Sequence, residues 1–138
     1  MVRAKDQAMI PQVDADDRTW AIYANATGLL VLTNIPFANV LAAALVWVRV
    51  RKNPETPFAR AHAAAVLNFQ VTWTVFTFAF VALLIVLSLN GRGSTMLPTI
   101  VIAYIALALL NVLLSVMGCS RASDLKGYRY PLSVTLVR

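Results

Sequence analysis

Three long runs without a charged side chain constrain the fold of this chain more than any other feature. They cover residues 19–48, 61–91 and 93–120, and each is longer than the roughly 20 apolar residues with which a helix crosses about 30 Å of hydrocarbon. Over the whole sequence, 59% of the residues are hydrophobic, 13% are charged, and the mean hydropathy is +0.70. Because a soluble domain carries about 25% charged residues, this composition predicts an all-α integral membrane protein.

The first run contains a break at its centre, in the hexapeptide NIPFAN at residues 34–39. Pro36 has no N–H group and disfavours a helical conformation in the residue before it. The sequence therefore predicts one helix over residues 17–33 and a second over residues 36–51, folded as a hairpin. Each would be about 25 Å long at 1.5 Å per residue, which is short for a crossing. The alternative is a single kinked first span, which would leave three transmembrane helices.

The distribution of lysine and arginine favours the hairpin, because cytoplasmic loops carry the excess of basic residues. With three crossings, the 12 basic residues divide four against eight. A hairpin in the first run instead leaves only Arg92 on the far side and places all the others together. We therefore expect a compact bundle of four transmembrane helices in a bacterial inner membrane, with both termini in the cytoplasm.

The other two runs predict the long helices and the domain boundaries. The third helix is expected over residues 56–89 and the fourth from residue 96 or 98 to residue 119, joined by a tight turn at residues 90–94. The expected division of the chain is a cytoplasmic N-terminal tail at residues 1–16, a transmembrane helical domain at 17–121 and a cytoplasmic C-terminal tail at 122–138.

Polar and small side chains inside the runs predict how the helices pack. In lipid, helices associate through close contact of small residues and through hydrogen bonds between polar side chains. The third helix carries polar groups on two opposite faces, so it is expected at the centre of the bundle with neighbours on both. Gln70 and Asn111 each lie about 15 Å inward from an arginine at the run boundary, which predicts a hydrogen bond between them. The residues expected to make packing and intramembrane polar contacts are Asn25, Gly28, His62, Asn68, Gln70, Thr74, Asn111, Ser115 and Gly118.

The basic residues lie next to the apolar runs and not in a soluble domain. The net charge of +6 therefore predicts attraction to anionic membrane lipids, and it does not predict binding to nucleic acid. The basic residues expected at the membrane surface are Arg49, Arg51, Lys52, Arg60, Arg121, Lys126 and Arg129.

The chain offers little for catalysis or for a cofactor. It contains one histidine and one cysteine, His62 and Cys119, whereas a metal site needs several histidine, cysteine or carboxylate ligands that converge. Asp14, Asp16 and Asp17 precede the first helix, whose N-terminus favours carboxylates, so they are expected to cap it. We therefore expect no enzyme activity, no metal, no cofactor and no small-molecule substrate. A membrane enzyme with His62 as its base is a minor alternative.

Three segments together resemble a known family. They are DRTWA at residues 17–21, PFARAH leading into AVLNFQ within residues 57–70, and GYRYPL at residues 127–132. These segments are similar to a family of small bacterial membrane proteins of unknown function, related to the twenty-kilodalton (Tic-twenty-like) subunit of the chloroplast inner-envelope translocon. The resemblance covers residues 17–137 and implies a helical membrane domain with four crossings and no catalytic residues. Asn25 stands where that family often has a histidine.

A small chain without a soluble domain has few ways to act other than by association. We expect a non-enzymatic accessory or assembly subunit of a larger membrane complex, with membrane lipids and other membrane-protein subunits as its partners. The alternative is a pore or protein-translocation component of the Tic-twenty-like type, in which the polar face of the third helix lines a path.

Overall fold

Helices make up the fold in the computed structural model of the chain, which describes residues 13–33, 35, 37–89, 93–131 and 133–137. In chain order the elements are α1 (Ala15–Ala26), the 3-10 helix η2 (Thr27–Thr33), α2 (Ala38–Val50), α3 (Pro57–Leu87) and α4 (Gly93–Ser123). These residues contain no strand, so the predicted all-α class is confirmed. Asn34 and Pro36, on which the predicted turn was based, lie outside the described residues, as do residues 90–92 of the second turn.

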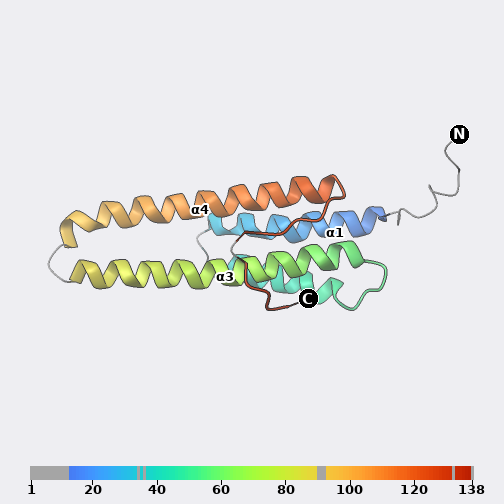
Figure 1. Ribbon diagram of the computed structural model, residues 1–138, viewed down its shortest axis with the longest axis horizontal. Helices are drawn as coiled ribbons and strands as arrows, with labels where there is room; N and C mark the ends of the chain where they lie inside the picture. The colour runs from blue at the N-terminus through green and yellow to red at the C-terminus, as the bar shows by residue number, and fades with distance from the viewer. Residues whose placement is uncertain (1–12, 34, 36, 90–92, 132, 138) are drawn as a thin grey trace, which may run out of the picture.

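The two long helices α3 and α4 form an antiparallel hairpin, and the shorter elements lie along one half of it (Figure 1). α1 runs beside α3 and α4, η2 continues beside α4, and α2 returns beside α3, so that α1, η2 and α2 form a short hairpin. The short hairpin ends level with Phe78, whose ring stacks on Phe37 with 5.4 Å between the centroids. Beyond that level α3 and α4 project as a pair (Figure 1). We call residues 79–87 and 97–105 of this pair the α3–α4 extension.

The lengths of the helices support two of the four predicted crossings. Among the described residues, Pro57–Leu87 and Leu97–Ser123 are long and apolar enough to cross a membrane, whereas α2 is a shorter apolar helix of 13 residues. Only 11% of the most apolar part of each long helix is buried within the chain. In a soluble protein such helices would be mostly covered, so their outer faces fit contact with lipid. The chain is a membrane protein, but four complete crossings are not confirmed.

A carboxylate from another helix fixes the start of α3. Pro57 suits a first turn because the N–H group that it lacks would have no partner there. The preceding residue, Thr56, makes no side-chain cap. Instead the buried carboxylate of Asp17 on α1 accepts hydrogen bonds from the backbone N–H groups of Phe58 at 3.1 Å and Ala59 at 2.6 Å. This contact joins the N-terminal ends of α1 and α3.

Replacing Asp17 by alanine should lower the free energy of unfolding by about 1–2 kcal/mol, because two N–H groups at the positive end of α3 lose their acceptor. Asp16→Ala is the matched control, since Asp16 is exposed in the same turn of α1. The α1 helix has its own cap in Asp14, whose side chain accepts from Ala15 N at 2.8 Å. Chemical unfolding of the detergent-solubilised variants measures the loss of stability caused by Asp17→Ala and by Asp16→Ala. An equal effect of the two substitutions would contradict the cross-helix cap.

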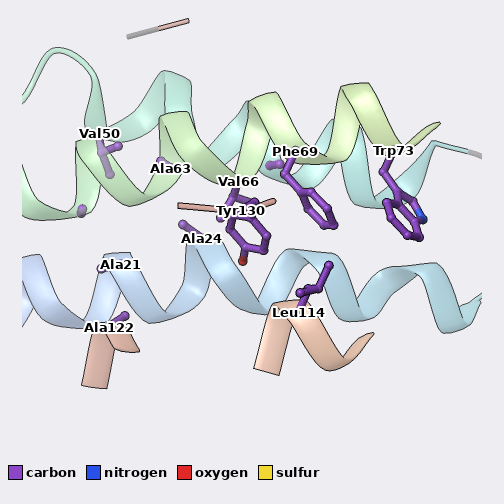
Figure 2. Packing of buried hydrophobic residues seen from close by; sticks show 12 residues of the cluster. Ala21, Ala24, Val50, Ala63, Val66, Phe69, Trp73, Leu114, Ala122 and Tyr130 are labelled. Carbon is purple, nitrogen blue, oxygen red and sulfur yellow. The ribbon is translucent and has the colours of Figure 1, made fainter. Parts of the chain in front are cut away.

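Small side chains allow α1 and α3 to approach closely. Figure 2 shows Ala21 and Ala24 of α1 opposite Ala63 and Val66 of α3, all of them buried. Helices that associate in lipid use small residues in this way, because small residues let the backbones approach and pack over a longer contact. The tight helix contacts position the polar side chains that lie between them.

Candidate functional site

Polar side chains fill much of the interior of the bundle. The buried polar residues in the described part of the chain are Asp17, Asn25, Thr27, Asn39, Thr56, His62, Asn68, Gln70, Asn111 and Ser115. Of the nine residues predicted to make packing or polar contacts, eight are buried and Thr74 is half-buried. Hydrogen bonds join several side chains of the interior into two groups. We call them the His62 cluster (Asn25, His62 and Tyr130) and the Gln70 cluster (Asn39, Gln70, Asn111 and Ser115).

The His62 cluster joins α1, α3 and the segment after α4. Asn25 Nδ2 donates to the Ala21 carbonyl at 2.7 Å and lies 3.0 Å from His62 Nδ1. His62 Nε2 lies 3.1 Å from the carbonyl oxygen of Lys126. Because an amide nitrogen only donates and a carbonyl only accepts, these contacts require a neutral imidazole with its hydrogen on Nε2. Both ring nitrogens of His62 are therefore occupied by protein contacts.

Tyr130 completes the His62 cluster from the C-terminal segment. Its hydroxyl donates to Asn25 Oδ1 at 2.7 Å, and its ring stacks on Phe69 with 4.4 Å between the centroids. Figure 2 shows the Tyr130 ring beside Phe69, with its oxygen directed toward α1. Burial raises the pKa of the Tyr130 phenol far above its ordinary value, so the hydroxyl keeps its proton and remains a donor.

The Gln70 cluster joins α2, α3 and α4 deeper in the bundle. Gln70 Oε1 accepts from Asn39 Nδ2 at 2.6 Å and from Asn111 Nδ2 at 3.2 Å. Ser115 Oγ lies 3.5 Å from Asn111 Oδ1. The predicted contact between Gln70 and Asn111 is present. Gln70, Asn111 and Ser115 have no exposed surface, so each of these amides depends on its neighbours for hydrogen bonds.

The amide of Asn111 has a second orientation that bonds η2. With its oxygen and nitrogen exchanged, it donates to the Gly28 carbonyl at 3.3 Å and accepts from Trp73 Nε1 at 3.2 Å, in place of its donation to Gln70 Oε1. Gly28 has to be glycine here, because an added methyl group would overlap Ser115 Oγ and lie 2.6 Å from Gln70 Nε2. The predicted small residue on the first helix thus lets η2 lie directly on the Gln70 cluster.

The face of α3 that carries Asn68 is covered by the C-terminal tail, which the structure describes at residues 128–131 and 133–137. Asn68 Oδ1 accepts from the backbone N–H groups of Leu136 and Val137, both at 2.9 Å, and Asn68 Nδ2 donates to the Val137 carbonyl at 2.9 Å. The N–H group of Val134 donates to Thr72 Oγ1 at 3.2 Å. The predicted second neighbour of α3 is therefore an extended segment and not another helix.

Replacing Asn68 by alanine should release the end of the tail from α3, because three hydrogen bonds to residues 136 and 137 are lost together. We expect hydrogen exchange at Leu136 and Val137 to become at least tenfold faster, while exchange in α4 stays unchanged. Thr74→Ala, on the same helix but away from the tail, is the control. Unchanged exchange in the Asn68 variant would show that other contacts hold the tail.

Thr74 has a different environment from the other predicted contact residues. It lines an apolar groove of about 450 Å³ between α3 and α4, at the point where the short hairpin ends. Trp73 and Asn39 line the inner end of this groove, and Tyr104 lines its α4 side. Asn111, Ser115 and Gly118 of α4 are therefore buried, whereas Tyr104 on the same helix is 39% exposed.

Six of the seven predicted basic residues lie at or next to the ends of α2 and α4 and the start of α3, which meet at one end of the molecule (Figure 1). Arg129 precedes Tyr130, whose ring stacks on Phe69 further along α3. The Arg49 guanidinium lies over the Trp20 ring at 5.6 Å, and that of Arg51 lies over the Trp47 ring at 4.8 Å. Cation–π contacts of this kind fix the arginines beside aromatic rings that favour a membrane interface. Lys52, Arg121, Lys126 and Arg129 are exposed, and Arg60 is half-buried. Their position at a membrane surface stays a prediction.

The contacts of three residues were not predicted from the sequence: Asn39 and Tyr130, which belong to the two clusters, and Asp17, which caps α3. Asn39 was interpreted only as part of a turn, although it lies ten residues before Arg49 and so at the depth of Gln70. Asp17 was expected to cap its own helix. Tyr130 lies outside the helices, where periodicity gives no information about contacts.

The described residues contain no group of three or more histidine, cysteine or acidic side chains that could hold a metal ion. Cys119 is half-buried, and its Sγ lies 3.8 Å from the carbonyl oxygen of Ile22. The arrangement of buried polar groups is thus one of mutual hydrogen bonds between elements, which holds helices together in a medium without water.

Comparison with known proteins gives one family and no individual relative. The profile of the MamF/MmsF family, described as the magnetosome magnetite crystal formation protein family, matches residues 16–137. Neither the curated proteins nor the solved structures contain a match. The resemblance to the Tic-twenty-like translocon family is therefore wrong, and the translocation role that it suggested has no support.

Proposed function

The chain belongs to the magnetosome magnetite crystal formation protein family, and we propose that it serves crystal formation as a non-enzymatic accessory protein of the membrane. It would act through association with other membrane proteins. The description of the family names the process, crystal formation. The hydrogen bonds of the buried side chains favour association over catalysis.

One observation carries this proposal: the buried side chains capable of chemistry are used in contacts between elements. Both nitrogens of His62 face protein atoms, the carboxylate of Asp17 caps α3, and the Gln70 amide binds Asn39 and Asn111. Groups that are already paired in the protein are poor candidates for binding a substrate. Their arrangement supports a role as a rigid scaffold.

The α3–α4 extension is the part that we propose for association. It exposes large apolar side chains, including Leu83, Ile85, Val101 and Ile102. Small residues between them, such as Ala82 and Ala103, allow another helix to approach. A partner helix that packs on this surface would gain close contact and would not disturb the polar clusters.

We call the end of the molecule where α2 and α4 end and α3 begins the basic end. Its basic residues support a cytoplasmic position for both termini. The short hairpin starts and ends beside the start of α3 and the end of α4 (Figure 1), so it returns to the side from which it enters, whatever its depth. α2 is about 20 Å long at 1.5 Å per residue, less than the roughly 30 Å of hydrocarbon. We propose that the long hairpin crosses the membrane, and that the short hairpin enters it from the cytoplasmic side.

Complementation in a magnetite-forming bacterium tests the function. A strain without its own family member should regain normal crystal formation, scored by electron microscopy, when it expresses this chain. His62→Gln, which keeps a hydrogen-bonding side chain but cannot titrate near neutral pH, should restore crystals as well as the unaltered chain. Loss of crystals with a correctly folded and localised His62→Gln protein would favour an enzyme. No restoration by the unaltered, membrane-inserted chain would contradict the proposed role.

A further inference from the structure

The contacts of His62 fit a neutral imidazole and do not fit an imidazolium ion. Nδ1 accepts from Asn25 Nδ2 at 3.0 Å, and Nε2 donates to the Lys126 carbonyl at 3.1 Å. A proton added to Nδ1 would make it a donor that faces another donor. The hydrogen bond between α1 and α3 would then be lost, whereas the bond from Nε2 to the Lys126 carbonyl would remain.

The amide of Asn25 cannot turn over to accept this proton without breaking other contacts. Its nitrogen also donates to the Ala21 carbonyl at 2.7 Å, and its oxygen accepts from the Tyr130 hydroxyl at 2.7 Å. Exchanging the two atoms would place the amide oxygen against the carbonyl oxygen of Ala21 and would take the acceptor from Tyr130. Asn25 has no exposed surface, so bulk water does not replace a lost partner. Every arrangement around a protonated ring therefore gives up at least one buried hydrogen bond.

The charged groups around His62 offer one carboxylate in partial compensation. Asp17 on α1 attracts a positive ring, but it is already bonded to two N–H groups at the start of α3. The acidic groups Glu55 and Asp124 are exposed, and Asp124 pairs with Lys126. The basic groups of the adjoining segments are Arg60, Arg121, Lys126 and Arg129. The other titratable groups of α4 and the C-terminal segment beside the cluster are Cys119, Tyr128 and Tyr130, which are ordinarily uncharged at and below neutral pH.

A groove between α3 and the C-terminal tail gives protons access to the ring. It has a volume of about 1090 Å³, and His62 lines it together with Asn68, Ser133 and Thr135. A space of this size with polar walls admits water. His62 is buried among protein atoms, yet one side of it borders the groove, so the ring can take up a proton without unfolding of the chain.

We propose that the His62 cluster is a pH-sensitive switch, in which uptake of one proton by His62 loosens the contacts of α1 and Tyr130 with α3. The Gln70 cluster consists of amides and a hydroxyl, so acid does not change the hydrogen bonds with which it joins α2, α3 and α4. The response to acid is thereby confined to the basic end. This proposal does not depend on the proposed role in crystal formation.

Nuclear magnetic resonance of the full chain in detergent tests the switch directly. His62 is the only histidine of the chain, so nitrogen-15 histidine labelling gives the signals of this ring alone. At about pH 7.5 they should show a neutral ring with its hydrogen on Nε2. As the pH is lowered to about 5, the signals of His62 and of the Tyr130 ring should change together. A hydrogen on Nδ1 at the higher pH, or titration of His62 without a change at Tyr130, would overturn the proposal.

Chemical unfolding of the same protein between about pH 7.5 and 5.5 measures the effect on stability. The folded chain favours the neutral ring, whereas the unfolded chain takes up a proton below the ordinary histidine pKa of about 6.5. Stability that is present above this pH is therefore lost as the pH falls. The unfolding constant should rise by up to about tenfold per pH unit, the limit for one proton. His62→Gln keeps an uncharged donor and acceptor and should remove this dependence.

Asn25→Asp should reverse the sign of the dependence. A carboxylate at this position accepts from a protonated His62, so the folded chain then favours the imidazolium ion. Its contribution to stability is present below about pH 6.5 and is lost as the pH rises. The slopes with pH are compared, so a general loss of stability in either variant does not affect the result. Equal slopes in the unaltered chain and His62→Gln would overturn the proposal, as would slopes of the same sign in the unaltered chain and Asn25→Asp.

Discussion

Gly118→Ala is expected to lower the free energy of unfolding by about 2–4 kcal/mol, through overpacking and loss of a buried hydrogen bond. A methyl group at Gly118 would overlap the oxygens of both Asn25 and Tyr130, which are the two atoms of a 2.7 Å hydrogen bond. Either this hydrogen bond breaks, or α4 moves away from α1. Unfolding of the detergent-solubilised protein, followed by tryptophan fluorescence, measures the loss.

Gly127→Ala is the matched control for this substitution. A methyl group at Gly127 would meet no heavy atom within 4 Å, so we expect a change within about 0.5 kcal/mol, as for ordinary surface positions. The comparison removes any general effect of a glycine-to-alanine change on the unfolded chain. If both variants lose the same stability, the close contact of α4 with the His62 cluster is not what requires glycine.

Gln70→Ala is the second large effect that we expect, with a loss of about 3 kcal/mol or more. The substitution leaves a cavity where Gln70 was fully buried, and it removes the acceptor of Asn39 Nδ2 and the partner of Asn111. Gln70→Leu restores the volume without the amide. Its loss should be about 1–2 kcal/mol, the range measured for polar contacts between helices in lipid.

Gln70→Ala and Gln70→Leu together separate the contribution of packing from that of hydrogen bonds at this position. Thr74→Ala, one turn further along the helix at a half-buried residue, is the control and should cost less than either. If Gln70→Leu were as stable as the unaltered protein, the Gln70 cluster would contribute packing alone. The role of its hydrogen bonds in holding α2 to α3 and α4 would then be contradicted.

The sequence allowed the Gln70–Asn111 contact to be predicted because simple geometry applies to it. Two helices that start from basic residues at the same end rise by the same distance per residue, so equal spacing from that end means equal depth. The same count from Arg49 places Asn39 at this depth, and the structure puts it on Gln70. This contact could have been found; it was missed because NIPFAN was interpreted only as a break.

Contacts between distant ends of elements could not be predicted in this way. Asp17 at the start of α1 looks like an ordinary capping residue, and only the folded chain shows that it caps α3. The contacts of Tyr130 and of residues 134–137 involve an extended tail, for which no helical period restricts the neighbours. The family was also assigned wrongly. The three segments on which the resemblance was based are short, and segments of five or six residues carry little family information.

We propose that the basic end faces the cytoplasm and that the long hairpin crosses to the other side. Labelling with a membrane-impermeant maleimide tests it in a Cys119→Ser background, with single cysteines at Lys52→Cys, between the two hairpins, and Leu89→Cys, beyond the end of α3. Both positions are exposed. Lys52→Cys should react only from the cytoplasmic side, and Leu89→Cys only from the opposite side. Reaction of both cysteines from the same side would contradict the account.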